Sequence, residues 1–262
     1  IEEYEFEDKN NLNFKNNIYL ATISRVEPSL QAAFVNFGRE RHGFLAFNDI
    51  QSDYYQLPSD DKEKIRLAEE QIREELKVKT IEGNSDNLQS ESNTEDKDEK
   101  NENFDNQNEK EQGKEKHREK VKSSFGIKRY KIQEVIKPGQ VILIQVIKEE
   151  RGQKGAALTT FISLAGKYIV LMPNTPKGGG ISRKIFNSTD RHKIRNILNE
   201  IEIPKSMGVI VRTAGANKTK NEIEKDFQNT LKTWEEIKDQ ALDSNAPSLV
   251  YEEGDIIKRT LR

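Results

Sequence analysis

The chain has 262 residues, enough for one large domain or two small ones with their own hydrophobic cores. Hydrophobic residues make up 33% and charged residues 34%, so part of the chain is not expected to join a core. The absence of cysteine excludes disulfides, thiolate metal sites and a cysteine nucleophile within this sequence, and it fits a reducing compartment.

No apolar run approaches the length of a transmembrane helix, and the start lacks the pattern of a signal peptide. The sequence begins without Met and stops within a strand-like pattern, DIIKRTLR. We therefore expect it to be a piece of a longer protein.

Short strands dominate the first part of the chain. Residues 1–7, IEEYEFE, alternate crudely and predict a strand whose partners lie elsewhere. Five closely spaced strands then favour the partly open barrel of an oligonucleotide-binding (OB) fold. They are IYLATISRV (18–26), AAFVNF (32–37), RHGFLAF (41–47), VILIQVIKE (141–149) and AALTTFISL (156–164).

A long excursion separates the third and fourth strands. Ser59 is predicted to cap a helix over residues 59–80, and residues 82–124 are predicted to be a disordered acidic insertion because they hold almost no apolar side chains. Residues 82–120 of the insertion carry a net charge of about −6, so the rest of the chain is mildly basic, at roughly +4.

A second unit follows the barrel. KYIVLMP (167–173) and MGVIVRT (207–213) predict strands, and Ser188 is predicted to cap the helix between them. A second helix is predicted from Thr219 to Leu242. This order predicts an α/β module. The apolar face of the second helix consists of Ile223, Phe227, Leu231, Trp234 and Ile237.

Two places on the chain could bind phosphates or bases. Phe34 and Phe44 are either a stacking platform for bases or core residues, and Arg39, Arg41 and His42 lie near them in the sequence. Lys154 is either a ligand of the same groove or a solvated lysine. At the end of a predicted buried strand, Arg212 and Thr213 could hold a terminal phosphate, with Gly166 allowing close approach and Arg183 adding charge. The alternative is an ordinary surface arginine. No constellation of catalytic residues is found, and GGG (178–180) lacks the GK[ST] of a nucleotide-binding loop.

Three stretches carry a resemblance to a known family. They are NIYLATISRVEPSLQAAFVNFGRERHGFLAF, KEERGQKGAALTTFISLAGKYIVLMPN followed by GGGISRK, and GVIVRTAG. In this order they resemble the amino-terminal part of the catalytic half of the ribonuclease E/G family, and RHGFL is closer to the E branch. The resemblance covers nearly the whole chain outside the insertion.

The resemblance implies an α+β fold in which a five-stranded OB-type S1 barrel and an α/β 5′ sensor are inserted into an incomplete RNase H-like subdomain. Residues 1–16 and 245–262 would be the two parts of that subdomain, residues 17–165 the S1 domain and residues 166–244 the 5′ sensor.

The resemblance also assigns roles to single residues. Those that match RNA-binding positions are Phe34, Phe44 and Lys154. Those that match the pocket for a 5′-monophosphate are Gly166, Val170, Arg183, Arg212 and Thr213. The chain departs from the family pattern at Lys184, where a second Arg often follows the first, and at Asn36, where an acidic residue is common.

For the parent protein, the resemblance implies a cytoplasmic endoribonuclease of rRNA and tRNA processing and mRNA decay that cuts single-stranded, AU-rich RNA. Two aspartates after Arg262 would hold Mg²⁺, and cysteines beyond the end would bind Zn²⁺ and link a homotetramer. Degradosome-type partners and peripheral association with the inner membrane would use regions outside this sequence. The alternatives are a non-catalytic RNA-binding or scaffold protein, and an interaction module built around the helix at 59–80.

Overall fold

The computed structural model describes residues 14–58, 61–63, 67, 130–150, 154–175, 180–204 and 206–253. The chain divides into two compact units, one of residues 1–56 and 132–262, the other of residues 57–131. The strand expected at 1–7, most of the helix expected at 59–80 and the insertion expected at 82–124 lie outside the described residues.

In the second unit, residues 61–63 are helical, and Pro58 precedes them. Its carbonyl accepts hydrogen bonds from the backbone N–H groups of Asp61 and Lys62. The hydroxyl of Tyr130 donates to Asp61 Oδ2 at 3.0 Å.

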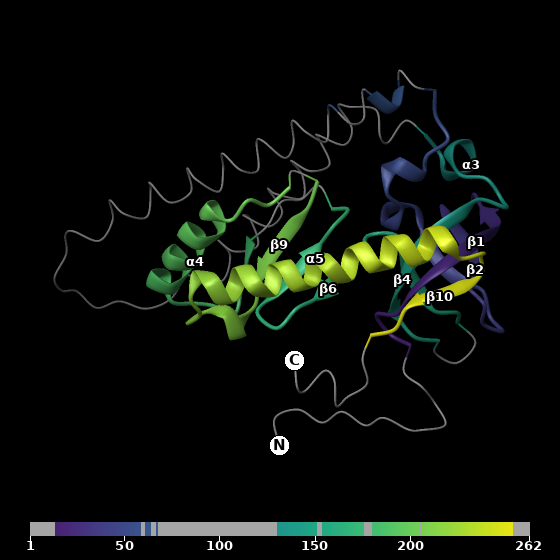
Figure 1. Cartoon of the computed structure of the whole chain (residues 1–262). Helices are drawn as coiled ribbons and strands as arrows, with labels where there is room; N and C mark the ends of the chain where they lie inside the picture. Colours follow the sequence, from purple (N-terminus) through teal and green to yellow (C-terminus); the bar gives the residue numbers. More distant parts are fainter. Residues whose placement is uncertain are drawn as a thin grey trace, which may run out of the picture. The chain divides into compact units, whose positions relative to one another are not determined.

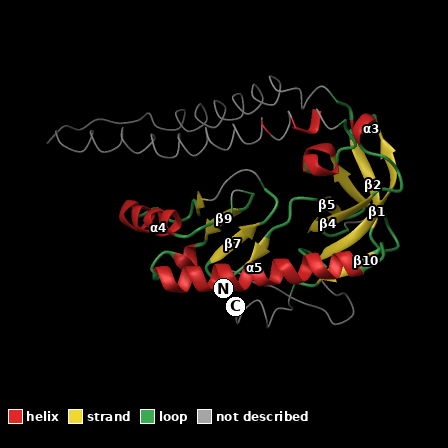
Figure 2. Ribbon diagram, turned by 45° about the horizontal axis from the view of Figure 1, so that its top comes forward, coloured by secondary structure: helices red, strands yellow, loops and turns green. Residues whose placement is uncertain are grey.

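The first unit contains a closed five-stranded barrel with one extra strand (Figures 1 and 2). The barrel closes because β1 pairs with β2 along one part of its length and with β4 along another, and β5 joins β3 to β4. The OB-type barrel predicted from the sequence is therefore confirmed. Its strands are β1 (Ile18–Glu27), β2 (Ala32–Asn36), β3 (Gly43–Ala46), β4 (Val141–Lys148) and β5 (Ala157–Thr159).

Alternation of side chains explains why these segments form a barrel. Along β2 and β3, every second residue is buried, whereas Phe34 and Phe44 between them are only half-buried. Successive strand residues point to opposite faces, so Phe34 and Phe44 lie on the outer face. The inward side chains include Ala33, Val35, Leu45, Ile144, Val146 and Leu158.

The last barrel strand is shorter than the sequence predicts. It ends at Thr159 rather than Leu164, because the backbone groups that follow bond to side chains instead of to a neighbouring strand. Ile162 N–H donates to the side chain of Asn174, and Ser163 N–H donates to Gln145 Oε1. Residues of this linker thus turn out of the barrel sheet, and Leu164 begins the next one.

Short helical segments cover the barrel between its third and fourth strands. They are the 3-10 helices η1 (Phe47–Asp49) and η2 (Ser52–Tyr54) and the helix α3 (Ile132–Val135), which the sequence did not predict. Ile132 and Val135 are fully buried, so α3 contributes to the core. Tyr54 accepts a hydrogen bond from Leu143 N–H through its hydroxyl, and burial raises the pKa of Tyr54.

The extra strand of this sheet is β10 (Ser248–Tyr251), which pairs antiparallel with Ile18–Leu20 of β1. The N–H of Glu253 also donates to Asn17 Oδ1 at 2.9 Å. Segments 1–16 and 245–262 remain a predicted subdomain, because residues 1–13 and 254–262 lie outside the described part of the chain.

A second, four-stranded sheet follows the barrel, in the order β6-β7-β9-β8. Neighbouring strands in this sheet are antiparallel except for β8 and β9. These two strands are parallel and are joined by the helix α4, as in a β-α-β unit. The sequence predicted a loop where the short strand β8 lies. The strands are β6 (Leu164–Ala165), β7 (Ile169–Met172), β8 (Gly180–Ile181) and β9 (Gly208–Val211).

Two helices pack with this sheet. The helix α4 (Ser188–Glu200) is capped by Asn187, whose side chain accepts from Thr189 N–H, so the predicted cap at Ser188 is wrong by one residue. The helix α5 (Lys220–Asp243) begins after Thr219, within one residue of the predicted bounds, and runs past β7 and β6 to β10 (Figures 1 and 2).

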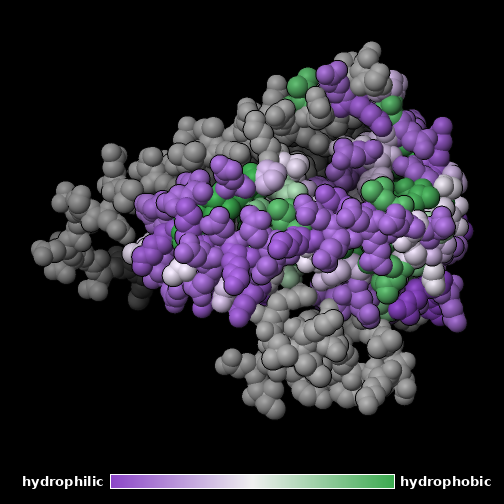
Figure 3. Space-filling view, in the orientation of Figure 1, coloured by the Kyte–Doolittle hydropathy of each residue, from purple (hydrophilic) through white to green (hydrophobic). Residues whose placement is uncertain are grey.

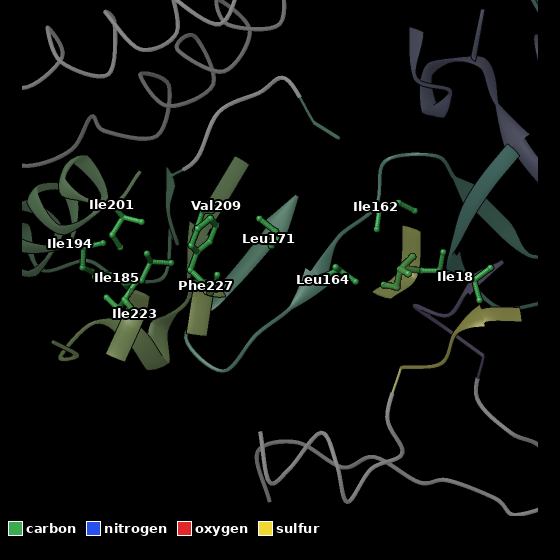
Figure 4. Packing of buried hydrophobic residues seen from close by; sticks show 14 residues of the cluster. Ile18, Ile162, Leu164, Leu171, Ile185, Ile194, Ile201, Val209, Ile223 and Phe227 are labelled. Carbon is green, nitrogen blue, oxygen red and sulfur yellow. The ribbon is translucent and has the colours of Figure 1, made fainter. Parts of the chain in front are cut away.

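The core of the second sheet lies between its strands and the two helices. Leu171 and Val209 of the sheet and Ile223 and Phe227 of α5 belong to one buried cluster, which extends through Ile162 and Leu164 to Ile18 and Val250 (Figure 4). The predicted face of α5 is confirmed at Ile223, Phe227 and Ile237, which are buried, while Leu231 and Trp234 pack at its edge.

The face of the molecule in Figure 3 is mostly hydrophilic, with hydrophobic side chains in small separate patches. Among the described residues, no helix is long and apolar enough to cross a membrane.

Candidate functional site

The first candidate surface lies on the outer face of the barrel. Phe34 of β2 and Phe44 of β3 are directly opposite each other in the strand register. Their ring centroids are 6.1 Å apart with an interplanar angle of 77°, an edge-to-face pair. Both rings are half-buried on the outer face, so they form a partly exposed aromatic surface and are not core residues.

A cation extends this pair on one side. Arg25 of β1 is opposite Phe34 in the register, and its guanidinium carbon lies 4.3 Å from the centroid of the Phe34 ring. This distance is typical of a cation–π interaction. The sequence analysis did not select Arg25, because its pairing with Phe34 depends on the register of β1 and β2.

Lys154 lies three residues before the start of β5. It is exposed and precedes Gly155, where an added Cβ would lie 2.2 Å from the carbonyl oxygen of His42. The strand β5 runs parallel to β3, with Phe44 opposite Ala157. Lys154 is therefore about 10 Å along the strands from the level of Phe44, at roughly 3.3 Å per residue.

Two other cations expected near the rings have local partners. Arg41 lies 3.9 Å from Glu150, and the guanidinium of Arg39 lies 4.4 Å from the ring centroid of Phe14. The exposed ion pair contributes little to stability.

The second candidate site lies at one end of the second sheet. Val170 of β7 is opposite Ile210 of β9, and Arg212 follows two residues later, so Val170 and Arg212 share a face of the sheet. Ser182 N–H donates to Val211 O, which places Arg183 directly after β8 and beside the end of β9. Thr213 begins the 3-10 turn η4 (Thr213–Gly215) and is exposed.

Arg212 is held by the backbone of the β6–β7 turn. Its Nη1 donates to the carbonyl oxygen of Gly166 at 2.9 Å, and its backbone N–H donates to Tyr168 O at 2.8 Å. One nitrogen of the guanidinium is therefore fixed, while the side chain as a whole remains exposed. The remaining N–H groups can bind a planar or tetrahedral oxyanion.

A carboxylate of α5 holds the same turn. Asp226 accepts three backbone N–H groups, from Lys167 at 3.0 Å, Tyr168 at 2.7 Å and Ile169 at 3.1 Å. The sequence analysis missed Asp226. The signal that could have found it is the polar pair Asp226 and Thr230 beside the apolar stripe of α5.

Cations gather around Tyr168. The ammonium of Lys218 lies 5.0 Å and that of Lys167 5.5 Å from the centroid of the Tyr168 ring. Hydrogen bonds to Glu222 and then to Tyr168 raise the pKa of Lys218, so its charge is retained at neutral pH. With Arg212 and Arg183, this end of the sheet has the positive charge that an anionic ligand needs.

A cavity of about 340 Å³ is lined by residues of the β6–β7 turn and of α5. The residues that line it include Lys167, Asn229, Thr233 and Tyr251. Within the residues that the structure describes, no group of three or more His, Cys, Asp or Glu side chains could hold a metal ion. The resemblance assigns the ligands of Mg²⁺ and Zn²⁺ to residues after Arg262.

The five residues predicted for a 5′-monophosphate thus come from one end of one sheet, and two of them, Gly166 and Arg212, are hydrogen-bonded to each other. Phe34 and Phe44 are in contact, whereas Lys154 lies apart from them. The roles of these residues stay predictions.

Comparison with known proteins gives a consistent picture. Residues 163–262 match the model of the ribonuclease E/G family. Over 248 residues, which are 95% of the chain, the sequence is 37% identical to ribonuclease E of Escherichia coli (strain K12) and 36% identical to ribonuclease E of Haemophilus influenzae. The chain belongs to the ribonuclease E/G family.

The match extends beyond these bacteria. Ribonuclease E of Synechocystis is 40% identical over 131 residues, half of this chain. The chain spans only 17% of the E. coli protein and 20% of the H. influenzae protein. The chain thus matches only a part of each of these relatives.

Proposed function

We propose that this chain is the RNA-binding and 5′-end-recognising part of an endoribonuclease of RNA processing and mRNA decay. The parent protein would cleave single-stranded, AU-rich RNA, with the chemistry carried by residues after Arg262. The observation that carries the proposal is the similarity to ribonuclease E proteins over 95% of the chain.

The outer face of the barrel supports the RNA-binding half of the proposal. Exposed aromatic rings are sequence-tolerant stacking surfaces, worth about 1–3 kcal/mol per base. Phe34 and Phe44 offer two such rings side by side, and Lys154 adds an exposed cation just before β5. These three residues would clamp the single strand.

The end of the second sheet supports the 5′-end-recognising half. A terminal monophosphate has a charge between −1.5 and −2 near pH 7 and several acceptor oxygens, which suits the free N–H groups of Arg212, the hydroxyl of Thr213 and the charge of Arg183. Val170, half-buried on the same face as Arg212, would contact the first nucleoside. A 5′-hydroxyl would leave these donors unpaired.

The rest of the assembly belongs to the same proposal. Mg²⁺ would be held by two aspartates after Arg262 and would activate water against the phosphodiester. Cysteines outside this sequence would bind Zn²⁺ and link a cytoplasmic homotetramer. Degradosome-type partners and the inner membrane would be contacted through other regions of the parent protein.

The 262-residue chain tests the proposal directly. We expect it to bind a 3′-labelled single-stranded AU-rich oligonucleotide with Mg²⁺ present without cleaving it, and to bind the 5′-monophosphorylated form about tenfold more tightly than the 5′-hydroxyl form. Arg212→Ala should abolish this preference and leave the affinity for the 5′-hydroxyl form unchanged.

Two results would contradict the proposal. Robust cleavage by the chain would place the chemistry within these residues. If the unaltered chain and the Arg212→Ala variant had the same preference between the two 5′ ends, the proposed 5′-recognition site would be wrong. Arg195→Ala, at a cation of α4, is the matched control.

A further inference from the structure

A row of five residues crosses the outer face of the barrel, one from each strand. The register places Arg25 opposite Phe34, Phe34 opposite Phe44, Phe44 opposite Ala157 and Ala157 opposite Lys148. None of the five is buried, whereas the chain neighbours of Phe34, Phe44 and Ala157 are. We call these five residues the cross-strand row. It begins and ends in a cation and has two aromatic rings between them.

The two cations are available to a ligand. Arg25 and Lys148 are both exposed, and within the part of the chain that the structure describes neither forms a salt bridge. The guanidinium of Arg25 lies over the Phe34 ring, with its central carbon 4.3 Å from the ring centroid, so it covers one face of that ring. Arginine planes stack on nucleic-acid bases as aromatic rings do.

Ala157 gives the row its shape. With strands about 4.8 Å apart, the four steps from β1 to β4 span roughly 19 Å. The two large rings occupy the second and third positions, and the small side chain of Ala157 leaves the fourth position low between Phe44 and Lys148. A strand of RNA whose bases stack on the rings can pass over Ala157 to reach Lys148.

We propose that single-stranded RNA crosses the barrel along this row, from β1 to β4, and that Arg25 and Lys148 are two further RNA contacts at its ends. Lys148 binds a backbone phosphate. Arg25 binds a phosphate and closes the stack on Phe34. The proposal rests on RNA binding by the barrel, which is part of the proposed function, and it adds the direction of the strand and two binding residues.

Salt dependence separates these contacts from general weakening. Each phosphate contact to a single strand contributes about 0.7 to the slope of log affinity against log salt concentration. The probe is a 3′-fluorescein-labelled oligouridylate with a 5′-hydroxyl, so that a 5′-phosphate site does not contribute. Binding of the 262-residue chain is measured by fluorescence anisotropy at several salt concentrations.

We expect Arg25→Gln and Lys148→Gln each to weaken binding roughly threefold to tenfold and to reduce the slope by about 0.7, and the double variant to reduce it by about 1.4. Arg25→Lys should retain the slope but bind more weakly than the unaltered chain, because an ammonium lacks the planar stacking surface. Lys137→Gln is the control, since Lys137 is an exposed cation of the same unit outside the row.

The outcomes distinguish the two levels of the proposal. If the unaltered chain does not bind the probe, or if Phe34→Ala with Phe44→Ala does not weaken binding, the proposed RNA binding by the barrel is wrong. If those two changes weaken binding but Arg25→Gln and Lys148→Gln behave like Lys137→Gln, the cross-strand row alone is wrong. Circular dichroism checks that every variant remains folded.

Discussion

Gly166 has no room for a side chain. An added Cβ would lie 2.6 Å from Asp226 Oδ2 and 2.9 Å from Thr230 Oγ1. The sequence suggested that this glycine allows a ligand to come close. In the structure, it is the helix α5 that packs closely against Gly166. The carbonyl of Gly166 accepts a hydrogen bond from Arg212 and so orients its side chain.

We therefore expect Gly166→Ala to destabilise the chain by about 1–3 kcal/mol, because Asp226 or the turn must shift. It should also weaken the preference for a 5′-monophosphate, since the partner of Arg212 moves. Gly180→Ala is the control, because no atom lies within 4 Å of an added Cβ at Gly180. Chemical denaturation measures the first effect and oligonucleotide binding the second. Equal stability of the two variants would contradict the packing argument.

Asp226 completes this arrangement, because it accepts the N–H groups of three successive residues. An asparagine offers one acceptor oxygen and places N–H donors against N–H donors. Asp226→Asn should therefore lower the free energy of unfolding by about 1–3 kcal/mol, as measured in urea. Asp239→Asn, at an exposed position of the same helix, should have little effect. A similar loss in both variants would mean that charge on α5, rather than the turn, is responsible.

At the scale of elements, the first turn of α5 is a charged capping box. Thr219 and Glu222 accept each other's backbone N–H groups, and Glu222 also pairs with Lys218 at 3.2 Å. The hydrogen bond from the backbone N–H of Thr219 is the main cause that lowers the pKa of Glu222, followed by those from the Thr219 hydroxyl and from Lys218. The start of α5 is thereby connected to Lys218, one of the cations beside Tyr168.

The sign of the pH dependence follows from this shift. Because the pKa of Glu222 is lower in the folded state, its contribution to stability is present above the unfolded pKa and is lost as pH falls through the folded pKa. Glu222→Gln should therefore lower the melting temperature near pH 7, and the difference from the unaltered chain should shrink toward about pH 3. Glu235→Gln, at an exposed position, is the control. A constant difference across this range would exclude the charge of Glu222 as its cause.

The joint between the barrel and the second sheet is also an element-scale feature. The buried side chain of Gln145 on β4 donates to the carbonyls of Asn16 and Ser163 and accepts from the backbone N–H and hydroxyl of Ser163. Its polar atoms are satisfied by this linker, so the direction in which the chain leaves the barrel is defined by hydrogen bonds.

At the scale of the whole molecule, residues 57–131 form a unit separate from the rest. On the other side of the junction, Ile132 and Val135 are buried in the first unit, and Val135 O accepts from Gln56 N–H. The residues on both sides of this insertion, Gln56 and Ile132–Val135, therefore belong to the barrel unit.

We expect that replacing residues 59–125 with a short Gly/Ser linker leaves the affinity for single-stranded RNA within about twofold, because the cost of closing a loop depends only weakly on its length. The cut retains α3, which the barrel core needs. Extending the deletion through Val135 is the comparison, and it should destabilise the barrel. A large loss of affinity in the shorter deletion would favour an interaction role for the helix predicted at 59–80.

Features that depend on neighbours in the chain could be predicted from the sequence alone. Short apolar segments bounded by turn residues predicted the barrel strands, an apolar stripe of helical period predicted α5, and the motifs around Phe34, Gly166 and Arg212 identified the family. Local periodicity and capping are short-range effects, so a single sequence contains them.

Features that depend on pairing between distant segments could not be predicted from the sequence. The early end of β5, the strand β8 and the cross-strand row all result from register, and the hold of Asp226 on the β6–β7 turn joins residues about 60 positions apart. A shift of one residue in register would move Arg25 away from Phe34 and turn its partners to the other face. The physical reason is that long-range hydrogen bonds and packing select one register among many that local sequence permits.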